Sequence, residues 1–177
     1  MIDIKGLPFA SNEAYPDSQT FSGNSADAKL LSKAFSSCGS ETTAILQYVF
    51  QHYVIPDEDI ANILGKIART EMIHHELLGE AIVKCGETPY YTNGFGGDYT
   101  TKCVYESSNL TDMLLQNIND EKAAIEYYEA IKPKLSNDNL KAMIDRIVLD
   151  EVIHIDTFTK LLEYINYYKD IEKPENT

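Results

Sequence analysis

The chain has few of the residues that build sulfur-based sites. Tryptophan is absent, there are only three cysteines among 177 residues, and no two of them form a Cys-x-x-Cys pair. An odd, scattered set argues against a disulfide framework and against a zinc or rubredoxin-type iron site within this chain. We therefore expect Cys38, Cys85 and Cys103 all to be free, either as small buried apolar side chains or as unused thiols.

Long apolar stretches are also missing. No uncharged apolar run approaches the roughly 20 residues that cross a bilayer, and the first residues do not resemble a secretion signal. These absences predict a soluble, cytoplasmic protein with no membrane partner. The length and the hydrophobic content of 44% are enough for one compact domain with a core.

Positive charge is scarce. Lys and Arg number 15 against 28 Asp and Glu, which gives a net charge of −13. Nucleic acids and anionic lipids need cations opposite their phosphates, so neither is an expected partner. The negative surface would attract metal cations, although its simplest role is to keep the protein in solution.

What the sequence does contain is helical periodicity. Apolar residues recur at steps of three and four in four segments, which predicts an all-α bundle. Proline and glycine mark the ends of these segments. The predicted helices cover about 26–55, 57–85, 111–132 and 136–169. The predicted organisation is an irregular N-terminal arm over 1–25, the bundle over 26–169 and a frayed tail over 170–177.

The connection between the second and third segments is unusually long. Residues 86–109 contain Pro89 and four of the nine glycines, and they show no sustained helical period. An extended chain covers about 3.3 Å per residue, so this connection can travel the whole length of a helix. It therefore predicts that the second and third helices run parallel.

An internal repeat relates the two halves of the chain at an offset of 80 residues. The first half contains Glu41-x-x-Ala-Ile-x-x-Tyr48 and the second contains Glu121-x-x-Ala-Ile-x-x-Tyr128. The sequence Glu-x-Ile-His likewise occurs once in each half, beginning at Glu71 and at Glu151. Two helix pairs related by a pseudo-twofold axis would produce this pattern.

Four glutamates lie in the middle of apolar stripes, where leucine would be expected. A single such Glu could reach solvent at the edge of a bundle, but Glu is almost never fully buried without a partner. In each Glu-x-x-His pair the His lies one turn later on the same face. Two divalent cations would balance four carboxylates, and carboxylate with imidazole suits iron or manganese. The predicted ligands are Glu41, Glu71, His74, Glu121, Glu151 and His154.

This ligand set resembles that of the ferritin-like di-iron carboxylate proteins, in particular bacterioferritin and rubrerythrin-type bundles. The motifs that carry the resemblance are Glu41, Glu71-Met-Ile-His74, Glu121 and Asp150-Glu151-Val-Ile-His154, with the long connection between them. The resemblance covers about residues 27–168. It implies a ferritin-like antiparallel four-helix bundle, with a long crossover between its second and third helices, that holds two iron ions.

The resemblance also implies roles for residues around the ligands. Tyr48 and Tyr128 would sit beside the metals and bond a ligand or give up an electron, although both could simply be core aromatics. Asp150 would accept the outer N–H of a ligand histidine, whereas Thr70 occupies the repeat-related place. Bacterioferritins bind haem through a methionine at the position of Met72. We expect no haem here, and we expect Met72 to pack against a partner helix in a homo-oligomer, at least a dimer.

The expected function is that of a di-iron oxidoreductase that reacts with O2 or H2O2, as a ferroxidase or a peroxide-detoxifying enzyme in oxidative stress. Rubrerythrins usually carry an extra Glu where this chain has Ala124, and the rubredoxin domain is absent, so an electron donor would be a separate protein. Two alternatives remain open. One is a dimanganese catalase-like enzyme, and the other is a non-enzymatic metal-binding or structural bundle protein.

Overall fold

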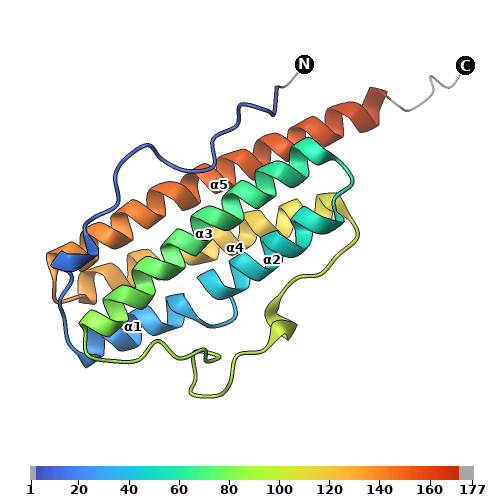
Figure 1. Cartoon of the computed structure of the whole chain (residues 1–177). Helices are drawn as coiled ribbons and strands as arrows, with labels where there is room; N and C mark the ends of the chain where they lie inside the picture. The colour runs from blue at the N-terminus through green and yellow to red at the C-terminus, as the bar shows by residue number, and fades with distance from the viewer. Residues whose placement is uncertain (1–2, 172–177) are drawn as a thin grey trace, which may run out of the picture.

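The computed structural model describes residues 3–171, and in this range five α-helices form a bundle without a β-strand (Figure 1). The all-α prediction is therefore confirmed. The helices are α1 (Ser25–Phe35), α2 (Glu41–Val54), α3 (Glu58–Lys84), α4 (Leu110–Ile131) and α5 (Asp138–Ile171).

Side-chain caps fix where the helices begin. The Asp57 carboxylate accepts the backbone N–H groups of Asp59 and Ile60, so α3 begins where the sequence predicted. Asn109 caps α4 in the same way, two residues before the predicted cap at Thr111. Caps of this kind satisfy N–H groups that have no partner within the helix.

The first predicted helix is in fact two, and the prediction of one continuous helix is wrong. α1 and α2 follow one another along one position of the bundle, separated by the segment Ser36–Ser40 (Figure 1). Within it the Ser37 N–H donates to the Ser40 hydroxyl at 2.8 Å, and Gly39 takes a φ of +77°. Serine side chains that bond the backbone and a left-handed glycine end a helix even where the apolar period continues.

The crossover runs back along the bundle, as predicted. In Figure 1 it leaves the end of α3 and reaches the start of α4 at the opposite end, so these two helices are parallel. Gly86, with a φ of +85°, turns the chain out of α3. The crossover contains one short 3-10 helix, η2 (Thr101–Cys103). Short turns join α2 to α3 and α4 to α5, which makes each of these pairs antiparallel.

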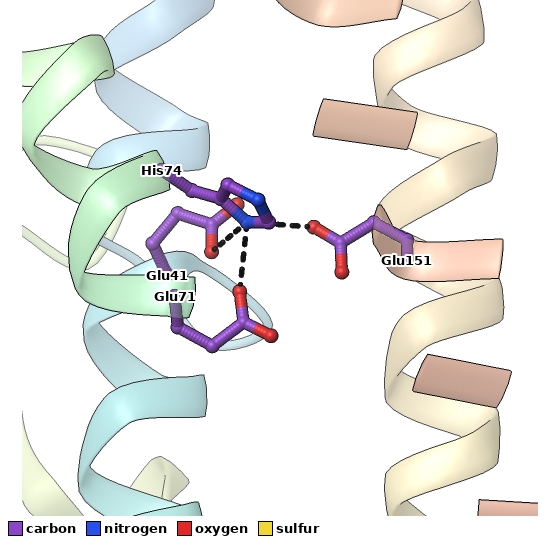
Figure 2. A group of neighbouring side chains, drawn as sticks. All are labelled: Glu41, Glu71, His74 and Glu151. Atoms are coloured by element: carbon purple, nitrogen blue, oxygen red, sulfur yellow. Dashed lines mark hydrogen bonds and ion pairs between the residues drawn. The ribbon is translucent and has the colours of Figure 1, made fainter. Parts of the chain in front are cut away.

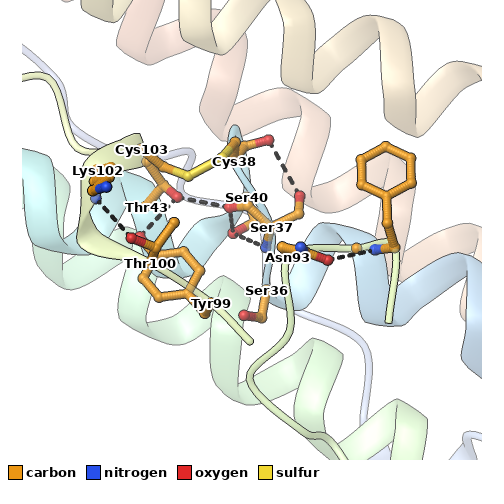
Figure 3. Close-up of a disulfide and its surroundings, with 12 residues drawn as sticks. Ser36, Ser37, Cys38, Ser40, Thr43, Asn93, Tyr99, Thr100, Lys102 and Cys103 are labelled. Carbon is orange, nitrogen blue, oxygen red and sulfur yellow. Dashed lines mark hydrogen bonds between the residues drawn. A yellow bond between two sulfur atoms is a disulfide. The ribbon is translucent and has the colours of Figure 1, made fainter. Parts of the chain in front are cut away.

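A disulfide fastens the crossover to the break between α1 and α2. It joins Cys38 to Cys103 across 65 positions of sequence (Figure 3). Beside it the hydroxyls of Thr43 and Tyr99 lie 3.0 Å apart. The prediction of three free thiols is thus wrong for two of them, because the crossover brings together cysteines that are distant in sequence. Cys85 is a buried free thiol, as predicted.

Reducing this disulfide is expected to lower the free energy of unfolding by about 4 kcal/mol, because the bond restricts a long loop in the unfolded chain. For a chain of this size the melting temperature should fall by on the order of 10 °C. Thermal unfolding with and without reductant measures the effect. The double variant Cys38→Ser/Cys103→Ser is the control and should not respond to reductant. A wild-type melting curve that reductant leaves unchanged would show that the bond contributes nothing.

Two apolar clusters fill the bundle, one toward each end. The first is formed mainly by α1, the end of α3 and the start of α5. The second is formed mainly by the starts of α3 and α4 and the second half of α5, with Tyr48 of α2. Between them the buried residues of α3 and α5 are polar. Fully buried members include Leu31, Leu78, Leu140 and Ile144 in the first cluster, and Tyr48, Leu64, Leu114 and Phe158 in the second.

At the ends of the described range, residues 3–24 contain one 3-10 turn, η1 (Ser18–Thr20), and no α-helix. This segment runs along α5 in Figure 1. Helix α5 continues to Ile171, beyond its predicted end near Lys169, and residues 172–177 of the predicted tail lie outside the described residues. Among the helices of residues 3–171, none combines the length and apolar character that crossing a membrane requires.

Candidate metal centre

Six buried side chains meet in the polar layer between the two apolar clusters. They fall into two overlapping groups of four, and within each group the potential ligand atoms all lie within 4.8 Å of one another. Figure 2 shows one group, in which side chains of α2, α3 and α5 point toward each other. The first group is Glu41, Glu71, His74 and Glu151, and the second is Glu71, Glu121, Glu151 and His154.

Glu71 and Glu151 belong to both groups because each presents one oxygen to each histidine. Glu71 Oε2 lies 3.0 Å from His74 Nδ1, and its Oε1 lies 2.9 Å from His154 Nδ1. Glu151 Oε1 lies 3.3 Å from His74 Nδ1, and its Oε2 lies 3.0 Å from His154 Nδ1. Two carboxylates that each face both positions have the arrangement of bridging ligands for a pair of ions.

Glu41 and Glu121 each belong to one group only. Glu41 Oε2 lies 3.7 Å from His74 Nδ1, and Glu121 Oε1 lies 3.4 Å from His154 Nδ1. Each position is thus served by one carboxylate of its own, one histidine and the two shared carboxylates. This is the pseudo-twofold arrangement that the repeat predicted.

The two histidine rings have the same orientation relative to the cluster. In both, Nδ1 faces the carboxylates and Nε2 faces outward. His74 Nε2 lies 3.0 Å from Asp150 Oδ2, and His154 Nε2 lies 3.0 Å from the Phe9 carbonyl oxygen. A carbonyl can only accept, so the His154 Nε2 carries a proton, and Asp150 selects the same form of His74. In the neutral form of each ring the lone pair is thereby placed on Nδ1, the nitrogen that would bind metal.

The pKa shifts in the metal-free cluster indicate a shortage of positive charge among its carboxylates. Burial, together with the neighbouring carboxylates, raises the pKa values of Glu41 and Glu121 well above the ordinary value. Burial disfavours charge on His74 and His154 too, but the surrounding carboxylates raise the pKa of each ring well above 6.5. Burial acts on Glu71 as well, yet the two histidines hold its pKa below the usual range. Without cations, the cluster therefore favours protonation of these groups, which reduces its negative charge.

The donor set fits two divalent ions. Four carboxylates would be balanced by two dipositive charges, and the two imidazoles would remain neutral. Within the described residues, Glu71 Oε1 has an ion-pair neighbour, His154 Nδ1 at 2.9 Å, but no assigned hydrogen-bond donor. A buried oxygen without a donor is available to a cation. The Cys38 sulfur is in the disulfide, which leaves an oxygen and nitrogen set suited to iron or manganese.

Tyr48 and Tyr128 are fully buried, and each bonds a glutamate of the opposite half of the repeat. The Tyr48 hydroxyl donates to Glu121 Oε1 at 2.5 Å, and the Tyr128 hydroxyl donates to Glu41 Oε1. Burial and the nearby carboxylates raise the pKa values of both phenols well above 10. Both tyrosines are therefore neutral hydrogen-bond donors that orient the two unshared carboxylates, and an electron-transfer role stays a prediction.

A cavity of about 210 Å³ adjoins the cluster on the crossover side. Glu41, Glu121 and Glu151 line it, together with both buried tyrosines and the crossover segment 102–105. The cavity is large enough for a small oxidant such as O2 or H2O2. The disulfide at Cys103 fixes the part of the crossover that forms its wall.

Sequence reasoning missed the part that the N-terminal arm takes in this site. Asp150 meets His74 as the resemblance implied, but it also accepts hydrogen bonds from the arm, namely from the Ser11 N–H at 2.6 Å and from the Tyr15 hydroxyl. The carbonyl of Phe9 takes the corresponding place beside His154. One feature of the sequence could have suggested this: Thr70, in the place related to Asp150, leaves the second histidine without a carboxylate partner.

Met72 is 45% exposed on α3. Its predicted packing against a second copy of the chain stays a prediction, and so does the absence of haem.

Comparisons with known proteins agree with this architecture. A sequence model of the protein family described as Rubrerythrin matches residues 29–162. A probable manganese catalase of Clostridium acetobutylicum is 23% identical over 159 residues, which cover 78% of this chain and 71% of that protein. The crystal structure of KatB, a manganese catalase from Anabaena, superposes with a TM-score of 0.81 at 22% identity, covering 90% of this chain and 81% of KatB. The bacterioferritin of Desulfovibrio desulfuricans gives a TM-score of 0.69 at 23% identity, covering 83% of this chain and 84% of the bacterioferritin. The predicted ferritin-like fold and the family resemblance are confirmed.

Proposed function

Because this chain belongs to the rubrerythrin family, we propose that it is a dinuclear-metal oxidoreductase that disproportionates hydrogen peroxide, with manganese as its metal. The observation that carries the proposal is the set of six buried donors, in which Glu71 and Glu151 each face both histidines. Two redox-active ions at these positions would together exchange the two electrons that convert peroxide to O2 or to water.

Two further observations favour manganese and peroxide over the di-iron expectation. The sequence relative from Clostridium acetobutylicum and the structural neighbour with the TM-score of 0.81 both bear the name manganese catalase. The overall reaction 2 H2O2 → O2 + 2 H2O uses one peroxide as reductant and the other as oxidant. It therefore needs no separate electron donor, in keeping with a chain that carries no rubredoxin-type cysteine pairs.

The side chains of the site have defined tasks in this reaction. Oxidation of one peroxide releases two protons, and reduction of the next consumes two. Glu41, Glu121 and Glu151 line the cavity, so their oxygens are the groups that an entering peroxide meets. Glu41 and Glu121, whose pKa values are raised by burial, are the carboxylates that can hold these protons. Tyr48 and Tyr128 keep Glu121 and Glu41 oriented through their hydroxyls. The apolar clusters on both sides exclude bulk water.

Oxygen release tests the proposal. Protein loaded with Mn(II) is expected to release one O2 for every two H2O2 consumed, measured with an oxygen electrode, far above the rate of free Mn(II). Glu76→Gln, at an exposed position of α3, is the matched control and should release oxygen at the wild-type rate. Manganese-loaded protein that consumes no peroxide, or consumes it without O2, would refute the catalase assignment.

A di-iron oxidase is the second candidate, favoured by the likeness to the bacterioferritin described as having a di-iron site. In that case the metal-free protein should rapidly oxidise about two Fe(II) per chain when O2 or H2O2 is supplied. Comparing this rapid Fe(II) oxidation with oxygen release by the manganese-loaded protein decides between the di-iron oxidase and the manganese catalase. Failure of both, with metal bound, would favour the non-enzymatic alternative.

A further inference from the structure

The N-terminal arm crosses the outer side of α3 and α5 directly behind the two histidines. Three hydroxyl or amide groups attach it there. Thr157 Oγ1 donates to the Pro8 carbonyl at 2.6 Å, Thr70 Oγ1 donates to the Phe9 carbonyl at 3.1 Å, and the Ser11 N–H donates to Asp150 at 2.6 Å. The threonines and Asp150 are buried in the structure that includes the arm, so they are shielded from bulk water.

On one half of the site the arm acts through Asp150. This carboxylate accepts from His74 Nε2 at 3.0 Å, and Ser11 and Tyr15 of the arm hold its two oxygens. Arg146 lies 2.8 Å from the same carboxylate and reaches the arm as well, donating to the Ser11 carbonyl at 3.0 Å. Its guanidinium also lies 4.0 Å from the centre of the Tyr15 ring.

On the other half the arm contacts the histidine itself. Thr70 holds the place that Asp150 has in the repeat, but its hydroxyl bonds the Phe9 carbonyl and not a ring. That carbonyl accepts from His154 Nε2 at 3.0 Å. A backbone group of the arm thus takes the place beside His154 that the Asp150 carboxylate takes beside His74.

We infer that residues 8–15 of the arm are part of the metal centre, as positioning groups that fix the rotation and protonated nitrogen of both ligand histidines. The inference rests on the proposed dinuclear site and extends it to a segment outside the bundle. Outer partners of a metal-bound imidazole set its orientation and strengthen it as a donor, and their loss typically costs about 10–100-fold in metal affinity. The arm serves the two halves through different groups, so each half can be weakened separately.

Binding of Mn(II) to the full-length protein tests the inference, with free Mn(II) followed by its electron paramagnetic resonance signal. Tyr15→Phe removes the hydroxyl that donates to Asp150, and it should lower the affinity for one of the two ions about 10-fold. Thr157→Val releases the Pro8 carbonyl next to Phe9 and should weaken the other ion by a similar factor. The double variant should therefore bind both ions more weakly.

Matched controls separate positioning from general damage. Tyr99→Phe removes a tyrosine hydroxyl that bonds Thr43, on the crossover side of the molecule, and Thr159→Val removes an exposed hydroxyl on α5. Both should bind two ions with wild-type affinity. A merely structural arm would lower the melting temperature of the metal-free Tyr15→Phe and Thr157→Val proteins and leave both affinities unchanged.

The outcomes distinguish this inference from the proposed function. If the wild type binds two ions and both arm variants bind them equally tightly, the inference is wrong and the proposed site stands. If both variants weaken the same single ion, the division of the arm between the halves is wrong. A wild type that binds no Mn(II) would overturn the proposed site and the inference together.

Discussion

Replacing Glu71 with glutamine is expected to abolish the binding of both metal ions, although it changes a single functional group. Glu71 presents one oxygen to each histidine and belongs to both groups of four potential ligands. Glutamine keeps the shape of the side chain but loses its charge and one of the two acceptor oxygens. The loss of activity should exceed the roughly 10–100-fold that follows when only an outer partner of a ligand is removed.

Comparison with Glu41→Gln makes this test specific. Glu41 belongs to one group only, so this variant is expected to retain about one ion per chain where the wild type binds about two and Glu71→Gln almost none. Elemental analysis of the purified variants measures these contents, and Glu76→Gln should match the wild type. Equal losses in the two variants would show that Glu71 does not bridge.

Metal binding is expected to depend steeply on pH and to release protons. The pKa values of Glu41, Glu121, His74 and His154 are raised in the metal-free protein by burial of the carboxyl groups and by the carboxylates around the rings, so all four groups keep their protons to a higher pH than in solution. Incoming cations must displace these protons, whereas Glu71, whose pKa is lowered, has none to give. Affinity should therefore rise with pH, by about 100-fold per unit where two protons leave for each ion.

Proton release can be measured directly when Mn(II) is added to weakly buffered, metal-free protein. We expect up to about four protons per chain near pH 7, fewer at higher pH, and almost none from Glu71→Gln. Mn(II) affinities measured between about pH 6 and about pH 8 should rise with pH as steeply as the number of released protons requires. Metal uptake that releases no protons and does not vary across this range would mean that the ions bind somewhere other than among these side chains.

The helices and the convergence of the six side chains follow from local patterns in the sequence. Periodic apolar residues define α3 and α5, and the Glu-x-x-His spacing places Glu71 with His74, and Glu151 with His154, on one face of each helix. The 80-residue repeat adds the pairing of the halves. The apolar period and the Glu-x-x-His spacing depend on neighbours within a turn or two of helix, and the repeat is visible when the two halves of the chain are compared. A single sequence is therefore enough to recognise these features.

The features that the sequence did not reveal depend on contacts between distant segments. The disulfide required the path of the crossover, which no pattern in 86–109 specifies. The Phe9 carbonyl belongs to the backbone, so no side chain marks its role beside His154. The break at Ser36–Ser40 could have been predicted, because a run of serine with glycine disfavours helix. The apolar period continues on both sides of it, however, and this period favoured one continuous helix.

The central claim is that the six buried side chains hold two metal ions, and anomalous X-ray diffraction from crystals of protein purified without a metal-affinity tag tests it most directly. Data collected above the manganese and iron absorption edges identify the metal and place it. We predict two peaks per chain, one among Glu41, Glu71, His74 and Glu151 and the other among Glu71, Glu121, Glu151 and His154, with Glu71 and Glu151 between them. A cluster without peaks after incubation with Mn(II) and Fe(II), or with a single peak, would contradict the dinuclear site and the function proposed from it.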